Sequence, residues 1–595
     1  MYGNFPFPIS KMTQDLDIII IPLTRLNKYK QFVVNHEWEW TFFGTDACLR
    51  ENVIKKLGEG NRYYYAEELS DITIKNKKPF LDWIAEIGKK QEQPFWWGTN
   101  IAYKNPLSTD LFLNICLLTL LKEWIDKGVK KRLVIVEHPP LLKACANNLD
   151  SPAILIEKSV ANCIGYTLKT VFFSWTRMLL FLIRYLNMWL LNKWFGVNYK
   201  KKLRDLFKSS PSILMYTWVE DRSFADGHFT DIYLGKLKTF YETKGLRTVF
   251  VISPEIPPRF MDKIYRSGEI IPTLLFISLA DIISSFFHSV SFKWAKALPD
   301  FCGFDLHPVF ENEKIKEKGK LCYYIALYYG FYNFFKETDI NCKAIIYPFE
   351  NQPWDKMAIM GMQKAESSSK MIAYQHTVVP CFLLNYFLGE NEKGIHPEPD
   401  IIVANGDTWA RVLKKSGFTC PIYNGGSLRY SKSEKKEGDV RNDKKEQSIL
   451  VLFSPVLSYT LDLIFYLKRR PWGDKKFLLK PHPDMPEKIV RKYAGTLPDN
   501  FIFIKGPLDE WFDKVGWAIH VGTTAAIECL MNGITVYKYI PERIDVDPFF
   551  GMNLPQRIVT ESDSLTFEHS KSVIRPDPDI IDEEFHEAVW NQVVQ

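Results

Sequence analysis

The sequence predicts an α/β protein with two doubly wound, parallel-sheet domains that face each other across a cleft. Three observations predict this fold class. The chain of 595 residues is too long for a single core. Short, continuously apolar segments recur along it, and helical patterns follow them. A charge-dense, apolar-poor segment, Tyr430–Gln447, interrupts this alternation once before it restarts.

The first region, residues 1–430, holds the first set of apolar segments and is expected to be the acceptor side. Each segment is interpreted as a buried strand of a parallel sheet, because strands covered on both faces are apolar throughout. The gaps between the segments match β-α-β units. The expected strands lie in Asp17–Leu23, Arg132–Pro140, Pro152–Lys158, Ser212–Asp221, Arg247–Pro258, Cys342–Glu350, Lys370–His376 and Pro399–Gly406.

A helical insertion at about 160–208 interrupts the first region. Its core, Val171–Leu191, has nearly the length of a membrane span, but Arg177 and Arg184 lie seven residues apart on one helix face. Arginine is costly at the centre of a bilayer. Further basic residues follow at Lys193, Lys200, Lys201, Lys202 and Arg204. The segment is therefore expected either to lie on an anionic membrane surface or to be a buried or interdomain helix.

The second region, residues 448–560, follows the charged linker at 431–447 and repeats the alternation. It is expected to be a compact α/β domain that binds a nucleotide donor, and 561–595 a tail with a helix. Its strands are expected in Ser448–Pro455, Lys476–Pro483, Phe501–Gly506, Trp517–Gly522 and Ile534–Ile540. Ligands bind at the carboxyl ends of strands in such sheets, so polar residues at strand ends are the candidate site.

Two segments of the second region end in such residues. Lys480 and His482 close an apolar run, and the flanking Pro481 and Pro483 restrict the backbone that carries the imidazole. Alone, this pattern also fits a histidine in an ordinary turn.

The second of these segments ends at Gly522, where Thr523 and Thr524 open a helix and Glu528 lies one turn further on. Hydroxyls and free N–H groups at a helix start suit a phosphate, although simple N-capping by threonine is the alternative. Because both segments lie in one small domain, phosphate binding is the favoured interpretation.

These two segments, in this order, resemble the donor half of GT-B glycosyltransferases that use cytidine nucleotides. Similar patterns occur in bacterial sialyltransferases, capsule Kdo transferases and teichoic-acid CDP-glycerol polymerases. The resemblance covers about the last quarter of the chain. It implies that His482, Thr523 and Thr524 bind the nucleotide and its phosphate, and more loosely that Glu528 does so.

Four further segments, Tyr347–Gly361, Ala373–Pro380, Asp400–Phe418 and Asn424–Tyr430, resemble an uncharacterised group of surface-carbohydrate biosynthesis proteins. Phe95–Ser108 belongs to the same resemblance. It implies a role in O-antigen or capsule assembly but identifies no reaction.

Acids and a histidine at strand ends of the first region are the candidate catalytic residues. Glu220 and Asp221 end one expected strand, Glu350 another, and His376 the next. Carboxyl groups there suit acid/base or nucleophilic work on an oxocarbenium-like sugar. The alternatives are solvated loop acids, helix capping by Glu350 and a histidine satisfied by backbone groups.

The acidic triplets Asp545–Asp547 and Asp577–Asp579 fit a D-x-D pattern, but neither ends a strand that leads into a helix. We therefore expect no metal site and no cofactor. Ten scattered cysteines without zinc-ligand spacing indicate free thiols, and no signal peptide is visible, so a cytoplasmic protein is expected. The net charge of +6 is small for this length and does not suggest a nucleic-acid partner.

The favoured function is therefore transfer of a sugar from a nucleotide donor, preferably CMP-linked Kdo or a nonulosonate, to a glycan or a lipid-linked acceptor. A CDP-glycerol-type phosphotransferase, a sugar-nucleotide epimerase and a non-catalytic scaffold of a carbohydrate assembly complex are the alternatives.

Overall fold

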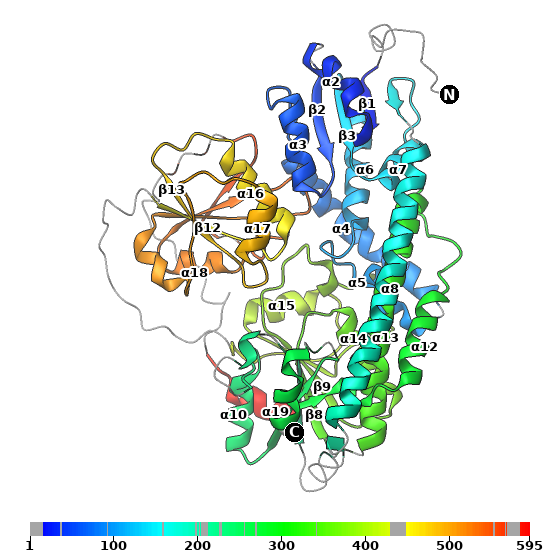
Figure 1. The fold of residues 1–595 in the computed structure, drawn as a ribbon, viewed down its shortest axis with the longest axis vertical. Helices are drawn as coiled ribbons and strands as arrows, with labels where there is room; N and C mark the ends of the chain where they lie inside the picture. The colour runs from blue at the N-terminus through cyan, green and yellow to red at the C-terminus, as the bar shows by residue number, and fades with distance from the viewer. Residues whose placement is uncertain are drawn as a thin grey trace.

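The computed structural model contains three parallel β-sheets, which follow one another along the chain and are flanked by helices (Figure 1). The expected Rossmann-type parallel sheets are confirmed, and the region 1–430 contains two of the three. The described residues are 16–595 except 36–37, 92, 158–159, 197–198, 201–202, 204–211, 220, 225–228, 255, 257, 268–269, 339, 341, 429–447, 551, 553, 564, 566 and 568–583.

The N-terminal sheet has the strand order β2-β3-β1-β4. Its central strand β1 consists of four fully buried isoleucines and Pro22, as expected for a strand covered on both faces. The strands are β1 (Ile18–Pro22), β2 (Glu39–Phe43), β3 (Arg132–Val136) and β4 (Ile154–Ile156). The helices of this domain are α2 (Leu26–Asn35), α3 (Ala47–Leu57), α4 (Ala66–Lys89), α5 (Asn100–Tyr103), α6 (Leu111–Asp126) and α7 (Pro139–Asn148).

The middle sheet has seven strands in the order β11-β10-β9-β8-β5-β6-β7, and all its pairs are parallel. The order reverses between β5 and β8, which makes the sheet doubly wound. The strands are β5 (Ser212–Thr217), β6 (Arg247–Ile252), β7 (Ile270–Pro272), β8 (Cys342–Pro348), β9 (Lys370–Gln375), β10 (Ile401–Ala404) and β11 (Ile422–Asn424). Its helices are α10 (Gly235–Thr243), α11 (Met261–Ser267), α12 (Leu279–Val290), α13 (His307–Thr338), α14 (Pro353–Lys364) and α15 (Asp407–Lys415).

The C-terminal sheet is doubly wound in the same way, with the order β14-β13-β12-β15-β16-β17 and its reversal between β12 and β15. The strands are β12 (Ser448–Leu452), β13 (Lys476–Lys480), β14 (Phe501–Phe503), β15 (Trp517–His520), β16 (Thr535–Tyr539) and β17 (Gln556–Val559). The helices are α16 (Leu457–Lys468), α17 (Glu487–Ala494) and α18 (Ala525–Met531). The expected linker at 431–447 lies outside the described residues.

The last helix, α19 (Glu587–Val594), returns to the middle domain. Trp590 is fully buried there; its indole N–H donates to the carbonyl of Gly425 at 3.0 Å, and its ring packs on Tyr374. A tail with a helix was expected at 561–595; the helix is α19, and it fixes the end of the chain to the middle sheet.

Most of the expected helical insertion forms the helix α8 (Val160–Gly196), which packs along α13 (Figure 1). Among the described helices, none combines the length and hydropathy needed to cross a bilayer. Of the basic residues that follow α8, Lys201, Lys202 and Arg204 lie outside the residues that can be described.

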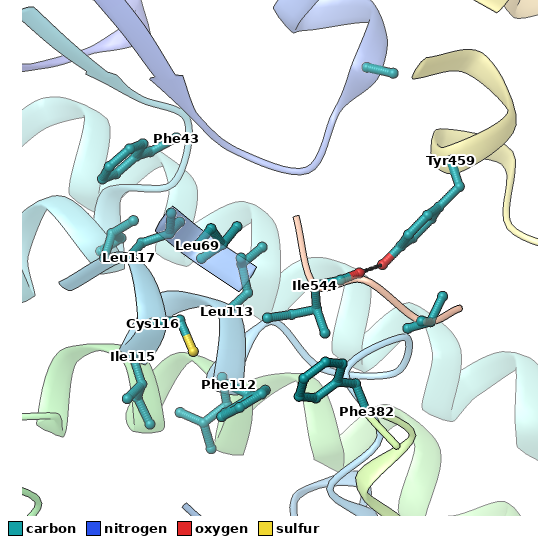
Figure 2. Close-up of a cluster of buried hydrophobic side chains, with 14 of the residues drawn as sticks. Phe43, Leu69, Phe112, Leu113, Ile115, Cys116, Leu117, Phe382, Tyr459 and Ile544 are labelled. Atoms are coloured by element: carbon teal, nitrogen blue, oxygen red, sulfur yellow. Dashed lines mark hydrogen bonds between the residues drawn. The ribbon is translucent and has the colours of Figure 1, made fainter. Parts of the chain in front are cut away.

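Apolar side chains from all three domains meet in one core (Figure 2). Phe382, from the loop after β9, packs on Phe550 of the C-terminal domain with ring centroids 4.8 Å apart. Tyr459 at the start of α16 donates a hydrogen bond to the carbonyl of Ile544 at 2.7 Å, beside Leu113 of α6 (Figure 2). The domains therefore share a continuous apolar interface.

Buried ion pairs join the N-terminal domain to the C-terminal domain. Their side chains are at most 12% exposed. Because a buried charge is costly without a partner of opposite sign, each of these charges is paired. The pairs are Arg50–Asp462 at 2.6 Å, Arg62–Glu542 at 2.6 Å and, within the C-terminal domain, Arg469–Glu561 at 2.7 Å. Glu561 also lies 3.7 Å from Arg62. Burial alone would raise the pKa of Glu561, but Arg62 and Arg469 outweigh it and lower the pKa to about 2.

Candidate functional site at two facing sheet edges

The carboxyl edge of the middle sheet carries the candidate acids. Glu350 follows β8 and Asp221 follows β5, and these two adjacent strands flank the point where the strand order reverses. His376 follows β9, the next strand along, so the expected convergence of Glu350 and His376 on one edge is found. Asp221 is the first residue of a 3-10 turn, Asp221–Phe224, but its side chain is not among those described, and Glu220 lies outside the described residues.

Glu350 and His376 face each other at this edge. The Nε2 atom of His376 lies 3.6 Å from Oε1 of Glu350, and the Gln352 amide donates a hydrogen bond to the other carboxyl oxygen. The histidine ring also contacts the ring of Tyr233, with centroids 4.6 Å apart. Glu350 keeps 29% of its side chain exposed, so the carboxyl group is held by protein on one side and open on the other.

Burial raises the pKa of Glu350, the hydrogen bond from the Gln352 amide lowers it by less, and the charge of Asp484 makes a smaller contribution that raises it. A carboxyl group with a raised pKa suits proton transfer near neutral pH. The helix-capping alternative for Glu350 does not hold, because Gln352 and Asp355 form the capping box of α14.

A pair of asparagines holds the backbone around Glu350, and no pattern in the sequence predicts this pair. The Asn385 amide donates to the carbonyl of Glu350 at 2.7 Å, and the Asn351 amide donates to the carbonyl of Asn385 at 2.6 Å. Asn351 has a φ of +50°, a left-handed conformation that costs energy in a residue other than glycine. Strain at this position, directly after the acid, is typical of a functional site.

Buried charges lie behind this edge. Lys104 forms an ion pair with Glu392, and neither side chain is more than 1% exposed. Burial, with help from Lys104, lowers the pKa of Lys356 to about 7, and burial raises that of Asp355 to about 8. Lys104 belongs to the segment Phe95–Ser108, and the ammonium group of Lys356 donates to the carbonyl of Ala102 in the same segment at 3.4 Å. The segments Phe95–Ser108 and Tyr347–Gly361 therefore pack together behind Glu350.

The carboxyl edge of the C-terminal sheet carries the expected donor residues. β13 ends at Lys480, which donates to the carbonyl of Gly506 and so supports the neighbouring turn. His482 follows, with 28% of its side chain exposed. Its Nδ1 accepts a hydrogen bond from the N–H of Asp484 at 3.2 Å, which leaves Nε2 as the protonated nitrogen that can donate.

The residues after β15 reach the same edge. Gly522 has a φ of +95° and lies against Val546 and Asp547, a conformation that favours glycine. Thr523 is buried and its hydroxyl accepts a long hydrogen bond, 3.4 Å, from the N–H of Ala525. Thr524, the residue before α18, makes no capping hydrogen bond with its side chain. The Thr524 hydroxyl therefore does not cap α18, which is a short helix of seven residues. Glu528 lies within this helix and is half-buried.

β12 lies between β13 and β15, so its end separates His482 from Thr523 at the point where the strand order reverses. Ser454 stands there, almost fully buried, and its Oγ accepts from the N–H of Val456 at 3.2 Å. Ser454 is not among the site residues expected from the sequence. Its position at the end of an apolar strand was the signal that could have found it.

The carboxyl edges of the two sheets come together through the loops that follow their strands. Phe382, in the loop after β9, packs on Phe550, in the segment after β16. The charge of Asp484, two residues after His482, also contributes to the raised pKa of Glu350. Two doubly wound sheets with facing edges form the expected GT-B-like arrangement.

The acidic triplet at 545–547 does not form a metal site. Lys538 forms ion pairs with both Asp545 and Asp547, the second at 3.0 Å, and Gln556 donates to Asp547. Asp577–Asp579 lies outside the described residues. In the part of the chain that can be described, no group of three histidine, cysteine, aspartate or glutamate side chains is arranged to hold a metal ion.

One cavity of about 180 Å³ lies at the opposite, amino-terminal end of β9, between Met362, Ser369, Lys370 and Asp400. It contains none of the expected site residues. Because ligands of doubly wound sheets bind at the carboxyl ends of strands, we place the candidate site at the facing edges.

Comparisons with known proteins do not assign the chain to a family. No family model matches the chain, and no curated protein matches it. Among solved structures, a UDP-GlcNAc 2-epimerase from Methanocaldococcus jannaschii has a TM-score of 0.37 at 9% identity and covers 64% of this chain and 99% of its own. MurG from Acinetobacter baumannii has 0.31 at 9%, covering 65% and 91%. The glycosyltransferase SnogD from Streptomyces nogalater has 0.29 at 12%, covering 60% and 88%. With TM-scores below 0.5 and identities of 9–12%, none of these structures assigns the chain to a family.

Proposed function

We propose that the protein is a glycosyltransferase that moves a sugar from a nucleotide donor to a glycan or lipid-linked acceptor in surface-polysaccharide assembly. The observation that supports this best is the approach of two strand-end sites from different sheets. One carries an acid with a raised pKa, Glu350, and the other carries His482 and the pair Thr523–Thr524.

The donor is proposed to bind the C-terminal edge. The Nε2–H of His482 can donate to a phosphate or ribose oxygen, and the hydroxyls of Thr523 and Thr524 can donate to the other side of the phosphate. Gly522 lets the backbone approach this position without a side chain. The resemblance to cytidine-nucleotide transferases makes CMP-linked Kdo or a nonulosonate the proposed donor.

The acceptor is proposed to lie against the middle-domain edge. There Glu350 would take the proton from an acceptor hydroxyl while the bond between the sugar and the nucleotide breaks, and His376 would hold the carboxyl group in place. We propose Asp221 as a second acid at the same edge, because it follows β5, the strand next to β8. The aromatic rings of Trp218, Tyr233 and Trp354 beside this edge offer flat apolar surfaces for a sugar ring.

Calorimetry with CMP, CDP and UDP tests the donor site. We expect CMP to bind best and His482→Ala to weaken its affinity about ten- to a hundredfold, as does the double change Thr523→Ala/Thr524→Ala, because each loses hydrogen bonds to a charged group. Thr496→Ala, in the same domain but before β14, is the matched control and should keep wild-type affinity.

The calorimetry also separates the alternatives. Preference for CDP would favour the phosphotransferase, and preference for UDP the epimerase. A protein that binds none of the three nucleotides would be a scaffold. Unchanged affinity in both variants would remove His482 and the threonine pair from the proposal.

A further inference from the structure

The long helix α8 has two apolar faces, and only one of them is covered. The covered face follows a heptad spacing and packs on α13, where Phe181 contacts the ring of Tyr323 and the Ser174 hydroxyl donates to the carbonyl of Ile315. Its members are Ser174, Met178, Phe181, Tyr185, Met188 and Asn192.

The other face of α8 carries a second apolar stripe, with a member every three or four residues, turned away from α13. Its eight members are between 36% and 83% exposed: Leu168, Phe172, Trp175, Leu179, Ile183, Leu186, Leu190 and Trp194. At 1.5 Å per residue the stripe is about 40 Å long. Single exposed apolar residues are normal on a protein surface, but a continuous stripe of this length indicates a docking surface.

The charges of α8 indicate which of two partners covers the exposed stripe, a second copy of the protein or an anionic lipid surface. The helix contains Lys169, Arg177, Arg184 and Lys193 and no acidic residue. If a second copy covered the stripe with its own stripe, Lys169 and Lys193 of both copies would be brought together without an anion from either helix. An anionic lipid surface, by contrast, places opposite charges beside these side chains.

The placement of the charges also fits a lipid surface. Lys169 and Lys193 lie near the two ends of the stripe, and their ammonium groups stand 5.9 Å and 5.3 Å from the rings of Phe173 and Trp189. Arg177 lies beside Gly319 of α13, next to the covered face of α8 and not on the stripe. Long basic side chains at the margin of an apolar surface can reach headgroups while their stems stay in apolar surroundings. The exposed Trp175 and Trp194 are of the type that concentrates at membrane interfaces.

We infer that α8 docks the protein on an anionic bilayer, with its axis in the membrane plane and its exposed stripe at the boundary between headgroups and acyl chains. Because the opposite face of α8 is part of the protein core, the helix lies on the membrane and does not cross it. The adjoining helix α12 exposes Leu279, Ile283 and Phe287, one on each turn, and adds apolar surface beside α8. The C-terminal sheet lies on the far side of the molecule from α8 (Figure 1).

Vesicle sedimentation of the full chain tests this inference. Wild-type protein should sediment with vesicles of phosphatidylglycerol and phosphatidylcholine, and less with phosphatidylcholine alone. The triple change Leu179→Ser/Ile183→Ser/Leu190→Ser should lower the partition coefficient about a hundredfold, because it removes three large apolar side chains from the contact.

The matched control is Ile489→Ser/Ile502→Ser/Ile558→Ser, which changes three exposed isoleucines of the C-terminal domain and should sediment like the wild type. A second variant, Lys169→Gln/Arg177→Gln/Lys193→Gln, keeps the stripe and should lose the preference for anionic vesicles. Circular dichroism checks that each variant is folded.

Three results would overturn the inference. The wild-type protein could fail to sediment with anionic vesicles, or the control could lose as much binding as the stripe variant. Sedimentation velocity could also show that the wild type is a dimer and the stripe variant a monomer. The last would assign the stripe to a second copy. None of these results depends on whether the protein transfers a sugar.

Discussion

Replacing Glu350 by glutamine should lower the turnover of sugar transfer by at least about a thousandfold and leave nucleotide affinity nearly unchanged. The change keeps the size of the side chain and its contact with His376, but it removes the group whose raised pKa suits it to take up a proton. The measurement is initial rate and nucleotide affinity on the same preparation.

The matched control for this variant is Glu390→Gln, in the same domain, whose side chain is 70% exposed and pairs with Lys393. It should retain wild-type turnover. A Glu350→Gln enzyme with near-normal turnover would exclude Glu350 from the chemistry, and Asp221 would then be the remaining acid at this edge. A matching loss of nucleotide affinity would instead indicate a role in binding.

Replacing Glu561 by glutamine should destabilise the protein by about 3 kcal/mol at pH 7, because the lowered pKa of this buried acid represents stabilisation of its charged form. The pKa is about 2 in the folded protein and near its ordinary value of 4.5 in the unfolded chain. This contribution is therefore complete above pH 4.5 and is lost as the pH falls towards 2. The difference between wild type and variant should shrink over that range.

Urea unfolding followed by tryptophan fluorescence at pH 7 and pH 3 measures the effect. Glu487→Gln is the control, because Glu487 forms a surface ion pair with Arg491 that is worth at most about 1 kcal/mol. Equal destabilisation of the Glu561 variant at both pH values would show that its effect comes from packing and not from the ion pairs with Arg469 and Arg62.

The alternation of strands and helices could be predicted from the sequence because strands covered on both faces are apolar throughout. The run of four isoleucines in β1 and the run before Lys480 show this directly. Strand pairing could not be predicted in the same way. The expected strands in Pro152–Lys158 and Ser212–Asp221 follow each other along the chain but belong to different sheets. Their residues do not show this, because the 37-residue helix between them could equally connect two strands of one sheet.

Part of the candidate site could likewise be predicted from the sequence, and part could not. Glu350 and His376 could be brought together from the sequence because they end consecutive strands, which are neighbours in the sheet. The asparagine pair that holds Glu350 could not, because Asn351 and Asn385 meet across 34 residues of chain. In α8 both faces are apolar, so only the packing against α13 shows which of them is left exposed.

Mass spectrometry of the nucleotide released from a panel of sugar nucleotides, in the presence of a glycan or lipid-linked acceptor, tests the central claim most directly. We expect CMP to be released together with a glycosylated acceptor, and only when the acceptor is present. We expect the Glu350→Gln protein to bind CMP but to release none from the donor. Recovery of every donor intact by a wild-type protein that binds CMP, or conversion of a UDP-sugar to its epimer without an acceptor, would contradict it.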